Sequence, residues 1–327
     1  VQASVSDLPF PIFRMVLTHK EHEPFHSSMV PCTFQVVAYF CSTMKVDDNT
    51  LLGLKGFFDQ SLRTHYDARE LANIFAILCE QALNIPYQKR RYDGMRVSES
   101  DLLYFFGAIK RLQKNEPIQY VVGHTYFYGL KMDCSPAALI PRPETEELVH
   151  WVLQDAPRQA RIIDYCTGSG CIALAIKQHL PSAMVQGIDL SEQAITLAKH
   201  NAAQLNLDVS FKCADIFGPV LESAIFDVIV SNPPYIGKEE AAGMRPHVLD
   251  FEPKMALFVE DSDVLIFYRR LADLAASQLV SGGYIAVEIN AGLGNETLGC
   301  FPEEFFRDIE LKADLSGRPR MIKAIRR

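Results

Sequence analysis

The sequence predicts an α/β protein in which a doubly wound, mostly parallel sheet of seven strands follows a small helical bundle and a β-hairpin linker. From residue 161 onward, short apolar runs alternate with segments that have helical spacing. This βαβ rhythm is typical of parallel strands joined by helices that cover both faces of one sheet. Before residue 117 the apolar residues recur at helical spacing, which indicates a separate helical unit.

The elements of the sheet follow from these patterns, and their arrangement is Rossmann-like. Strands are predicted at residues 161–166, 184–188, 209–213, 226–231, 284–288, 306–313 and 321–325. Helices are predicted at residues 171–179, 192–206 and 263–279, and one more begins at Glu144 after two prolines.

The chain is predicted to divide into an N-terminal extension, a helical domain, a β-hairpin linker and an α/β domain, at residues 1–43, 44–116, 117–142 and 143–327. The extension has no sustained period, and Met44 opens a well-patterned sequence, so we expect the domain to start there. Asp67 and Glu70 have the spacing of a capping box in the helical domain. In the linker, Tyr120–Tyr128 is aromatic and β-rich, and Gly129 follows as a turn residue.

Charge and cysteine content limit the class of protein. The net charge of −8 lies in residues 126–327, so this part has no general attraction for nucleic-acid backbones. The eight cysteines include no Cys-x-x-Cys pair, and together with the nine histidines they form no metal set, so we expect buried free thiols and no metal. No apolar run reaches the roughly 18 residues of a membrane span and no signal peptide is evident, which predicts a soluble cytoplasmic protein.

A turn of small residues marks the first candidate ligand site. Asp164-Tyr165-Cys166-Thr167-Gly168-Ser169-Gly170 joins a predicted strand to a helix, where small residues let the backbone approach a ligand closely. Asp189 ends the next strand, where a carboxylate can accept hydrogen bonds from both ribose hydroxyls. Alternatively, Asp189 or Ser191 caps the following helix. Together these motifs predict an adenosine-containing cofactor, and Asp215 either meets its adenine or stands in an ordinary turn.

The most specific signal is Asn232-Pro233-Pro234-Tyr235, directly after a predicted strand. The prolines restrict the backbone, so that the Asn232 side-chain oxygen and the Pro233 carbonyl can face one point. These two acceptors match the two N–H groups of a planar –NH2. Holding both hydrogens favours a pyramidal nitrogen whose lone pair faces a methyl donor, and Tyr235 offers a ring to stack on the target. The alternative is a rigid turn without chemistry.

These motifs resemble those of the peptide-chain release factor glutamine N5-methyltransferases, a family of class I S-adenosylmethionine-dependent methyltransferases. The resemblance runs from about Met44 to Arg327, nearly the whole chain beyond the predicted extension. It includes the segments Glu116–Gly123, Phe127–Leu130, Pro141–Glu147, Thr167–Gly170, Ser231–Ile236, Phe251–Lys254 and Ser281–Tyr284. The Asn-Pro-Pro-Tyr motif is shared with other amino-methyltransferases, whereas the helical domain and the block that begins at Pro141 are much more discriminating.

The resemblance implies a donor, a substrate and their places. S-adenosylmethionine would lie on Cys166–Gly170, with Asp189 at its ribose, Ile216 beside its adenine and Asn232 near its methyl group. The substrate implied is the glutamine of the Gly-Gly-Gln loop of class I release factors, held at Asn232–Tyr235. The helical domain would help to dock the release factor. We expect a monomer that contacts neither nucleic acid nor membrane directly.

Two positions depart from the family pattern. Cys166 stands where the family often has glycine, so its side chain must point away from the cofactor or narrow the loop. Ile216 stands where some members carry an aromatic residue beside the adenine, which would replace stacking by apolar contact.

Several charged residues have open roles. Arg142, Glu144 and Glu146 either belong to a loop that closes over the ligands, or they open a helix at the surface. Glu288, at a strand end, is equally open, and Glu252 is a candidate to hold the loop after the Asn-Pro-Pro-Tyr motif.

Two other functions fit parts of the sequence. An enzyme that methylates adenine N6 or guanine N2 would use the same four residues, but it would need a positively charged groove for the nucleic acid. A module that keeps the fold without catalysis would not need the intact glycine-rich and Asn-Pro-Pro-Tyr segments.

Overall fold

The computed structural model describes residues 49–84, 94–219 and 226–327. The predicted start of the helical domain at Met44 lies outside the described residues. The other predicted domain boundaries stay predictions, because the structure gives elements rather than domain limits at these positions.

Three helices come first: α2 (Leu51–Leu62), α3 (Ala68–Leu83) and α4 (Glu99–Leu112). Their buried faces meet through Phe58, Phe75 and Phe105, whose neighbouring rings lie 5.2 and 5.5 Å apart. The predicted capping box is confirmed, since Asp67 Oδ1 accepts from the Glu70 N–H at 2.8 Å and Glu70 Oε2 accepts from the Asp67 N–H at 3.3 Å. Local sequence signals therefore set the start of α3.

The linker holds a short helix before its hairpin. The helix α5 (Ile118–Val122) precedes the antiparallel strands β1 (His124–Phe127) and β2 (Leu130–Asp133). The β-rich reading from Tyr120 is wrong over its first residues, because the Pro117 carbonyl accepts from the Tyr120 N–H at 3.0 Å and starts a helical turn. Gly123, at φ 81°, ends that turn. The predicted turn at Gly129 is confirmed, with φ 80°.

The predicted seven-stranded sheet is confirmed. Its strands are β3 (Arg161–Tyr165), β4 (Met184–Asp189), β5 (Ser210–Cys213), β6 (Phe226–Ser231), β9 (Leu279–Glu288), β10 (Phe306–Ala313) and β11 (Pro319–Arg326). They lie in the order β10-β11-β9-β6-β3-β4-β5. Only β11 runs antiparallel to its neighbours, so the sheet is mostly parallel.

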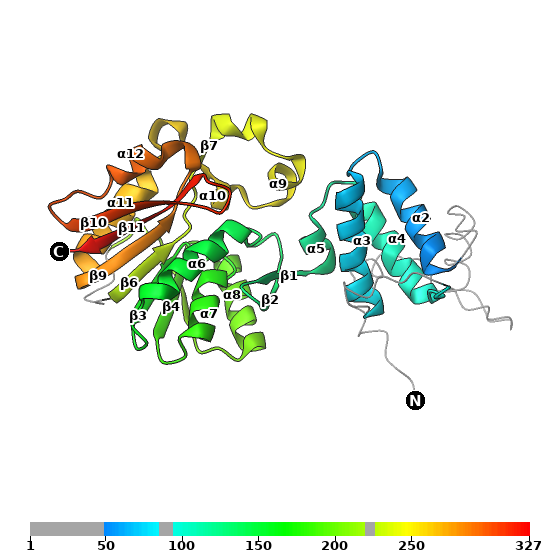
Figure 1. The fold of residues 1–327 in the computed structure, drawn as a ribbon, viewed down its shortest axis with the longest axis horizontal. Helices are drawn as coiled ribbons and strands as arrows, with labels where there is room; N and C mark the ends of the chain where they lie inside the picture. Colours follow the sequence, from blue (N-terminus) through cyan, green and yellow to red (C-terminus); the bar gives the residue numbers. More distant parts are fainter. Residues whose placement is uncertain (1–48, 85–93, 220–225) are drawn as a thin grey trace, which may run out of the picture. The chain divides into compact units, whose positions relative to one another are not determined.

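Helices cover both faces of this sheet (Figure 1). On one face pack α6 (Pro143–Asp155), α7 (Cys171–His179) and α8 (Glu192–Leu205), through a core that includes Leu148, Leu174 and Ala198. On the other face, α11 (Ile266–Gln278) contributes Tyr268 and Leu271 to a second core. The doubly wound prediction is therefore confirmed, and the carboxyl ends of the parallel strands share one edge.

Short elements that the sequence did not predict follow β6. They are β7 (Ile236–Gly237), a 3-10 turn η3 (Lys238–Gly243), α9 (Pro246–Phe251), α10 (Lys254–Leu257), β8 (Phe258–Val259) and a further 3-10 turn η4 (Asp261–Asp263). Beyond β9 lie η5 (Ala291–Leu293) and α12 (Gly294–Leu298). Each has two to six residues, too few to show a hydrophobic period.

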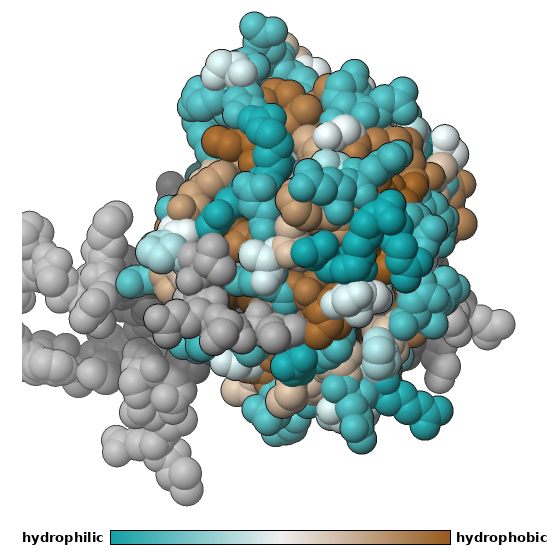
Figure 2. All heavy atoms as spheres, turned by 90° about the vertical axis from the view of Figure 1, so that its left-hand side faces the viewer, coloured by the Kyte–Doolittle hydropathy of each residue, from teal (hydrophilic) through white to brown (hydrophobic). Residues whose placement is uncertain are grey.

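The surface is largely polar on the side that Figure 2 presents, where hydrophobic residues form separate small patches. The six cysteines in the described part of the chain are free thiols, as predicted. Cys79 is buried as expected, whereas the expectation of burial is wrong for Cys213, which is exposed because β5 is the edge strand. Within the described ranges, no helix is both long and apolar enough to cross a membrane.

Candidate active site

A cavity of about 290 Å³ lies at the carboxyl ends of β3, β4, β5 and β6. The chain runs from β3 outward to β4 and β5 and then returns to β6 on the other side of β3. Ligands of doubly wound sheets bind at such a reversal of strand order. The cavity lining includes nine of the predicted site residues: Cys166, Thr167, Gly168, Ser169, Asp189, Asp215, Ile216, Asn232 and Pro234.

Asp164 holds the glycine-rich turn from the side that faces away from the cavity. This side chain is fully buried and does not line the cavity, and its Oδ2 accepts from the Thr167 hydroxyl at 2.5 Å. Burial raises the pKa of Asp164 to about 7. Gly168, by contrast, lines the cavity and donates its N–H to Asp189 Oδ2 at 2.9 Å. Asp164 therefore supports the conformation of the loop, and the loop residues that can contact a cofactor are those that line the cavity, Cys166–Ser169.

Gly170 also lies outside the cavity lining, but the loop needs glycine there. Its φ is 81°, and a Cβ at this position would come within 2.9 Å of the Phe211 ring and 3.1 Å of the Ala198 Cβ. Gly168 has a comparable φ of 56°, yet the nearest atom to its Cβ would be 3.8 Å away. The two glycines thus share the backbone conformation and differ in the space around them.

We expect Gly170→Ala to lower the free energy of unfolding by about 2–4 kcal/mol, from left-handed backbone strain and overpacking against Phe211. Gly168→Ala is the matched control and should lose only about 1–2 kcal/mol, because it adds the strain without the clash. Urea unfolding followed by far-ultraviolet circular dichroism measures both. Equal losses for the two variants would contradict the packing argument.

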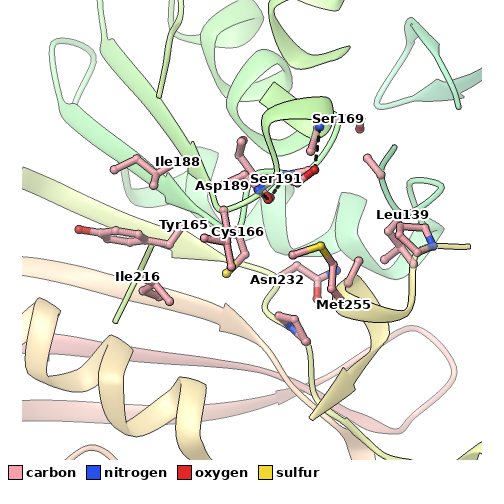
Figure 3. Close-up of a pocket in the computed structure, with 18 of the residues that line it drawn as sticks. Leu139, Tyr165, Cys166, Ser169, Ile188, Asp189, Ser191, Ile216, Asn232 and Met255 are labelled. Carbon is pink, nitrogen blue, oxygen red and sulfur yellow. Dashed lines mark hydrogen bonds between the residues drawn. The ribbon is translucent and has the colours of Figure 1, made fainter. Parts of the chain in front are cut away.

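Asp189 presents its carboxylate to the cavity beside the glycine-rich turn (Figure 3). Its Oδ1 accepts from the Ser191 N–H at 2.9 Å, so each oxygen holds one backbone donor and keeps a second lone pair. Burial raises the pKa of this carboxyl. The side-chain cap of α8 is Ser191, whose Oγ accepts from the Ala194 N–H at 3.1 Å. The capping alternative therefore applies to Ser191, and Asp189 remains free to accept from a ligand.

An apolar end of the cavity lies beside Ile188 and Ile216, which Figure 3 shows close to Tyr165. Asp215 lines this end and also forms a turn, with its Oδ1 accepting from the Phe217 N–H at 2.9 Å. Sequence reasoning missed Phe217, which lines the cavity next to Ile216. Its position beside a predicted site residue was the only available signal.

The Asn-Pro-Pro-Tyr segment borders the same cavity. Asn232 and Pro234 line it, and Figure 3 draws Asn232 between Cys166 and Met255. Pro233 is buried and Tyr235 is partly buried, and neither is among the lining residues. The Tyr235 hydroxyl donates to Glu288 Oε1 at 3.1 Å. The stacking of this ring on a substrate therefore stays a prediction.

The side chain of Asn232 is held by a residue that sequence reasoning did not name. Its Nδ2 donates to the Thr145 hydroxyl at 3.2 Å, and that hydroxyl donates to Glu288 Oε2 at 2.6 Å. Thr145 lies in the first turn of α6 and also lines the cavity. It stands inside the Pro141–Glu147 block, which was the signal that could have found it.

An ion pair between Arg142 and Glu252 borders the cavity on another side. Arg142 lines it and contacts Glu252 Oε1 at 2.5 Å, while the other carboxylate oxygen accepts from the Ile140 N–H at 3.1 Å. Glu252 has a fully buried side chain, and Met255, three residues later, also lines the cavity. Glu252 thus ties the end of the loop that follows the Asn-Pro-Pro-Tyr motif to the segment before α6. The sequence suggested that Glu252 holds this loop, but it did not suggest the partner segment.

Glu144 and Glu146 lie in the first turn of α6 and do not line the cavity. Glu146 Oε1 accepts from the Tyr128 N–H at 2.7 Å, which ties the helix to the hairpin turn. Each of the two alternatives for these charged residues therefore applies to some of them. Arg142 lines the cavity, whereas Glu144 and Glu146 lie in the first turn of a helix.

Comparison with known proteins assigns the family. Residues 144–246 match the model of the methyltransferase small domain. A release factor glutamine methyltransferase of Flavobacterium psychrophilum is 37% identical over 276 residues, covering 81% of this chain and 95% of the relative. One from Bacteroides thetaiotaomicron is 36% identical over 278 residues, covering 84% and 99%. The chain belongs to the release factor glutamine methyltransferase family.

The structure explains both departures from the pattern of this family. Cys166 has a φ of 59°, a left-handed conformation that glycine adopts without strain, and its side chain packs partly against the second core. Ile216 is buried in the cavity wall, and the rings of Phe217 and Phe267, which line the cavity beside it, lie 5.1 Å apart. Aromatic surface is thus supplied by neighbours of Ile216.

Proposed function

We propose that this protein transfers the methyl group of S-adenosylmethionine to the side-chain amide nitrogen of the glutamine in the Gly-Gly-Gln motif of class I release factors, in the cytoplasm. The observation that carries the proposal is one cavity that joins Asp189 and the glycine-rich turn to Asn232. Membership of the family supports the substrate, since the relatives are named for release factor glutamine methylation.

The residues present suit S-adenosylmethionine. Asp189 keeps a lone pair on each oxygen for the two ribose hydroxyls, and the small residues Thr167–Ser169 leave room along the loop. Ile188, Ile216 and Phe217 offer an apolar slot for a flat base, with Asp215 at its edge as an acceptor for an amino group. When bound, the sulfonium supplies an electrophilic methyl group.

The chain's part in the reaction is to hold and orient the target nitrogen. An amide nitrogen is a poor nucleophile because its lone pair is delocalised into the carbonyl. Asn232 Oδ1 and the Pro233 carbonyl would each accept one N–H, which favours a pyramidal nitrogen with its lone pair toward the donor. The Asn232 carboxamide is already held by the Thr145 hydroxyl, and the two prolines restrict the backbone at Pro233, so the proposed catalysis is electrostatic preorganisation. The nitrogen would lose one of its two protons to solvent after it has gained the methyl group.

The test is incubation of the protein with methyl-labelled cofactor and a purified class I release factor. Label should appear on the wild-type factor and be absent when the motif is changed to Gly-Gly-Ala. A parallel incubation with ribosomal or transfer RNA addresses the competing nucleic-acid function, which the acidic charge of residues 126–327 disfavours. Label on the RNA would contradict the proposal. Equal label on the wild-type release factor and on its Gly-Gly-Ala variant would contradict it as well.

A further inference from the structure

We infer that Thr145 and Glu288 are positioning residues that fix the orientation of the Asn232 carboxamide, so that its oxygen and not its –NH2 faces the target nitrogen. The inference rests on the proposed function for the reaction that it serves. It assigns a role to Glu288, which the sequence left open, and to Thr145.

The three side chains come from distant parts of the chain and form one hydrogen-bonded relay, in which Glu288 and Thr145 are buried and Asn232 is partly buried. Glu288 ends β9 and is 1% exposed, and Thr145, in α6, is 2% exposed. Glu288 Oε2 accepts from the Thr145 hydroxyl at 2.6 Å, and the Thr145 oxygen accepts from Asn232 Nδ2 at 3.2 Å. Asn232 and Thr145 both line the cavity that Asp189 also lines, whereas Glu288 is not among the lining residues.

The direction of each bond follows from the chemistry of the groups. An ionised carboxylate can only accept, so the single hydroxyl hydrogen of Thr145 must point to Glu288. The Thr145 oxygen then has only lone pairs left for Asn232, and it must meet the amide –NH2. The donors and acceptors of these three groups therefore select one of the two amide orientations of Asn232. Asn232 Oδ1 is consequently turned away from Thr145.

The selected orientation is the one that the chemistry requires. With Oδ1 toward the substrate, Asn232 accepts a hydrogen bond from the glutamine –NH2. A reversed carboxamide would place its own –NH2 against the substrate –NH2, two donors facing each other. The cost of such an unmatched pair corresponds to between about 10- and 100-fold in rate.

Several groups around Glu288 stabilise its ionised form and so oppose the effect of burial, which favours the neutral form. Burial raises the pKa of Glu288, and the negative charge of Glu144 on α6 acts in the same direction. The Thr145 hydroxyl, the Tyr235 hydroxyl and the cation of Arg320 on β11 lower it. Tyr268 of α11 donates to the Glu288 backbone carbonyl at 3.2 Å. If Glu288 gained a proton it could donate to Thr145, whose hydroxyl could then turn to Asn232 Oδ1 and release the constraint.

The decisive variant is Thr145→Val, which keeps the shape of the side chain and removes the hydroxyl. At saturating release factor, kcat should fall between about 10- and 100-fold, while the dissociation constant for S-adenosylmethionine stays within about threefold. Thr145→Ser restores the hydroxyl and should keep kcat within about threefold of wild type. Thr297→Val is the matched control, because Thr297 is fully buried and its hydroxyl bonds only within the α12 region, to the Leu293 carbonyl.

The outcomes separate the inference from the proposed function. Suppose that the wild-type enzyme labels the release factor. The relay alone is then overturned if Thr145→Val has the kcat of the wild type, or if Thr145→Ser is as slow as Thr145→Val. A wild-type enzyme that labels no release factor overturns the proposed function first.

A second measurement covers the case in which Thr145→Val does not fold. The kcat of the wild type should fall on the acid side, at a pH above the ordinary range of a glutamate because burial raises the pKa of Glu288. The amide that replaces the carboxylate in Glu288→Gln does not titrate. The kcat of this variant should therefore not show the fall at low pH, even if its activity is lower than that of the wild type. An identical limb in both proteins would overturn the inference.

Discussion

Asn232→Ala is expected to lower kcat for glutamine methylation by about 100- to 1,000-fold, the range seen when one preorganised hydrogen-bonding group is removed from a reacting centre. The substitution removes Oδ1, one of the two proposed acceptors for the target –NH2. It also frees the Thr145 hydroxyl, which in the native protein accepts from Asn232. Binding of the cofactor should change little, because the glycine-rich turn and Asp189 do not depend on this side chain.

The measurement is single-turnover transfer of labelled methyl to the release factor, together with a calorimetric titration of the cofactor. Asn295→Ala, on the exposed side of α12, is the matched control and should match the wild type in both. Transfer at the normal rate by Asn232→Ala would refute the proposed mechanism. A loss of cofactor binding equal to the loss of rate would place Asn232 at the donor rather than at the substrate.

Asp189→Ala should have the opposite profile, with the dissociation constant for S-adenosylmethionine raised about 100-fold and kcat at saturating cofactor near normal. Two charge-assisted hydrogen bonds to ribose hydroxyls would be lost, at about 1.5 kcal/mol each. The Gly168 and Ser191 N–H groups would also lose their acceptor, which loosens the turn under the cofactor.

Asp215→Ala is the comparison for this variant, because Asp215 also lines the cavity but supports only a local turn through the Phe217 N–H. We expect a smaller effect there, about 10-fold or less. A dissociation constant within twofold of wild type for Asp189→Ala would remove Asp189 from the ribose site. Absence of binding by the wild type at near-millimolar cofactor would instead favour a module without catalysis.

The parts of the fold that the sequence predicted are those set by local periodicity. The bounds of β6 and α7 were predicted to the residue, because an apolar run and an amphipathic run are each bounded by clear signals. The exposure of Cys213 was missed because the position of β5 at the sheet edge depends on strand order, which no local pattern contains. The helical turn at Tyr120 was missed because aromatic and β-branched residues favour strands. The N-cap at Pro117, which starts the helix instead, was missed as well.

The candidate site divides in the same way. Asp189 and Asn232 follow strands, and parallel strands end at one edge, so their meeting in one cavity followed from topology. The relay could not be predicted, since Thr145 and Glu288 are 143 residues apart and meet only when α6 packs beside β9. The motif predicts cofactor contacts for Asp164 and Gly170 as well, but neither residue lines the cavity, because Asp164 is fully buried and Gly170 packs against Phe211 and Ala198.

The pairing of β11 bears on how the protein matures during synthesis. This strand lies between β10 and β9, and its residues Met321–Ile325 pair with Tyr284–Glu288 of β9. A nascent chain that ends before Met321 lacks the strand residue that pairs with Glu288, so the hydrogen-bonded relay that holds Asn232 lacks this support at that stage. Shorter fragments would accordingly be able to fold β3, β4 and α7 while the support for Glu288 is still missing.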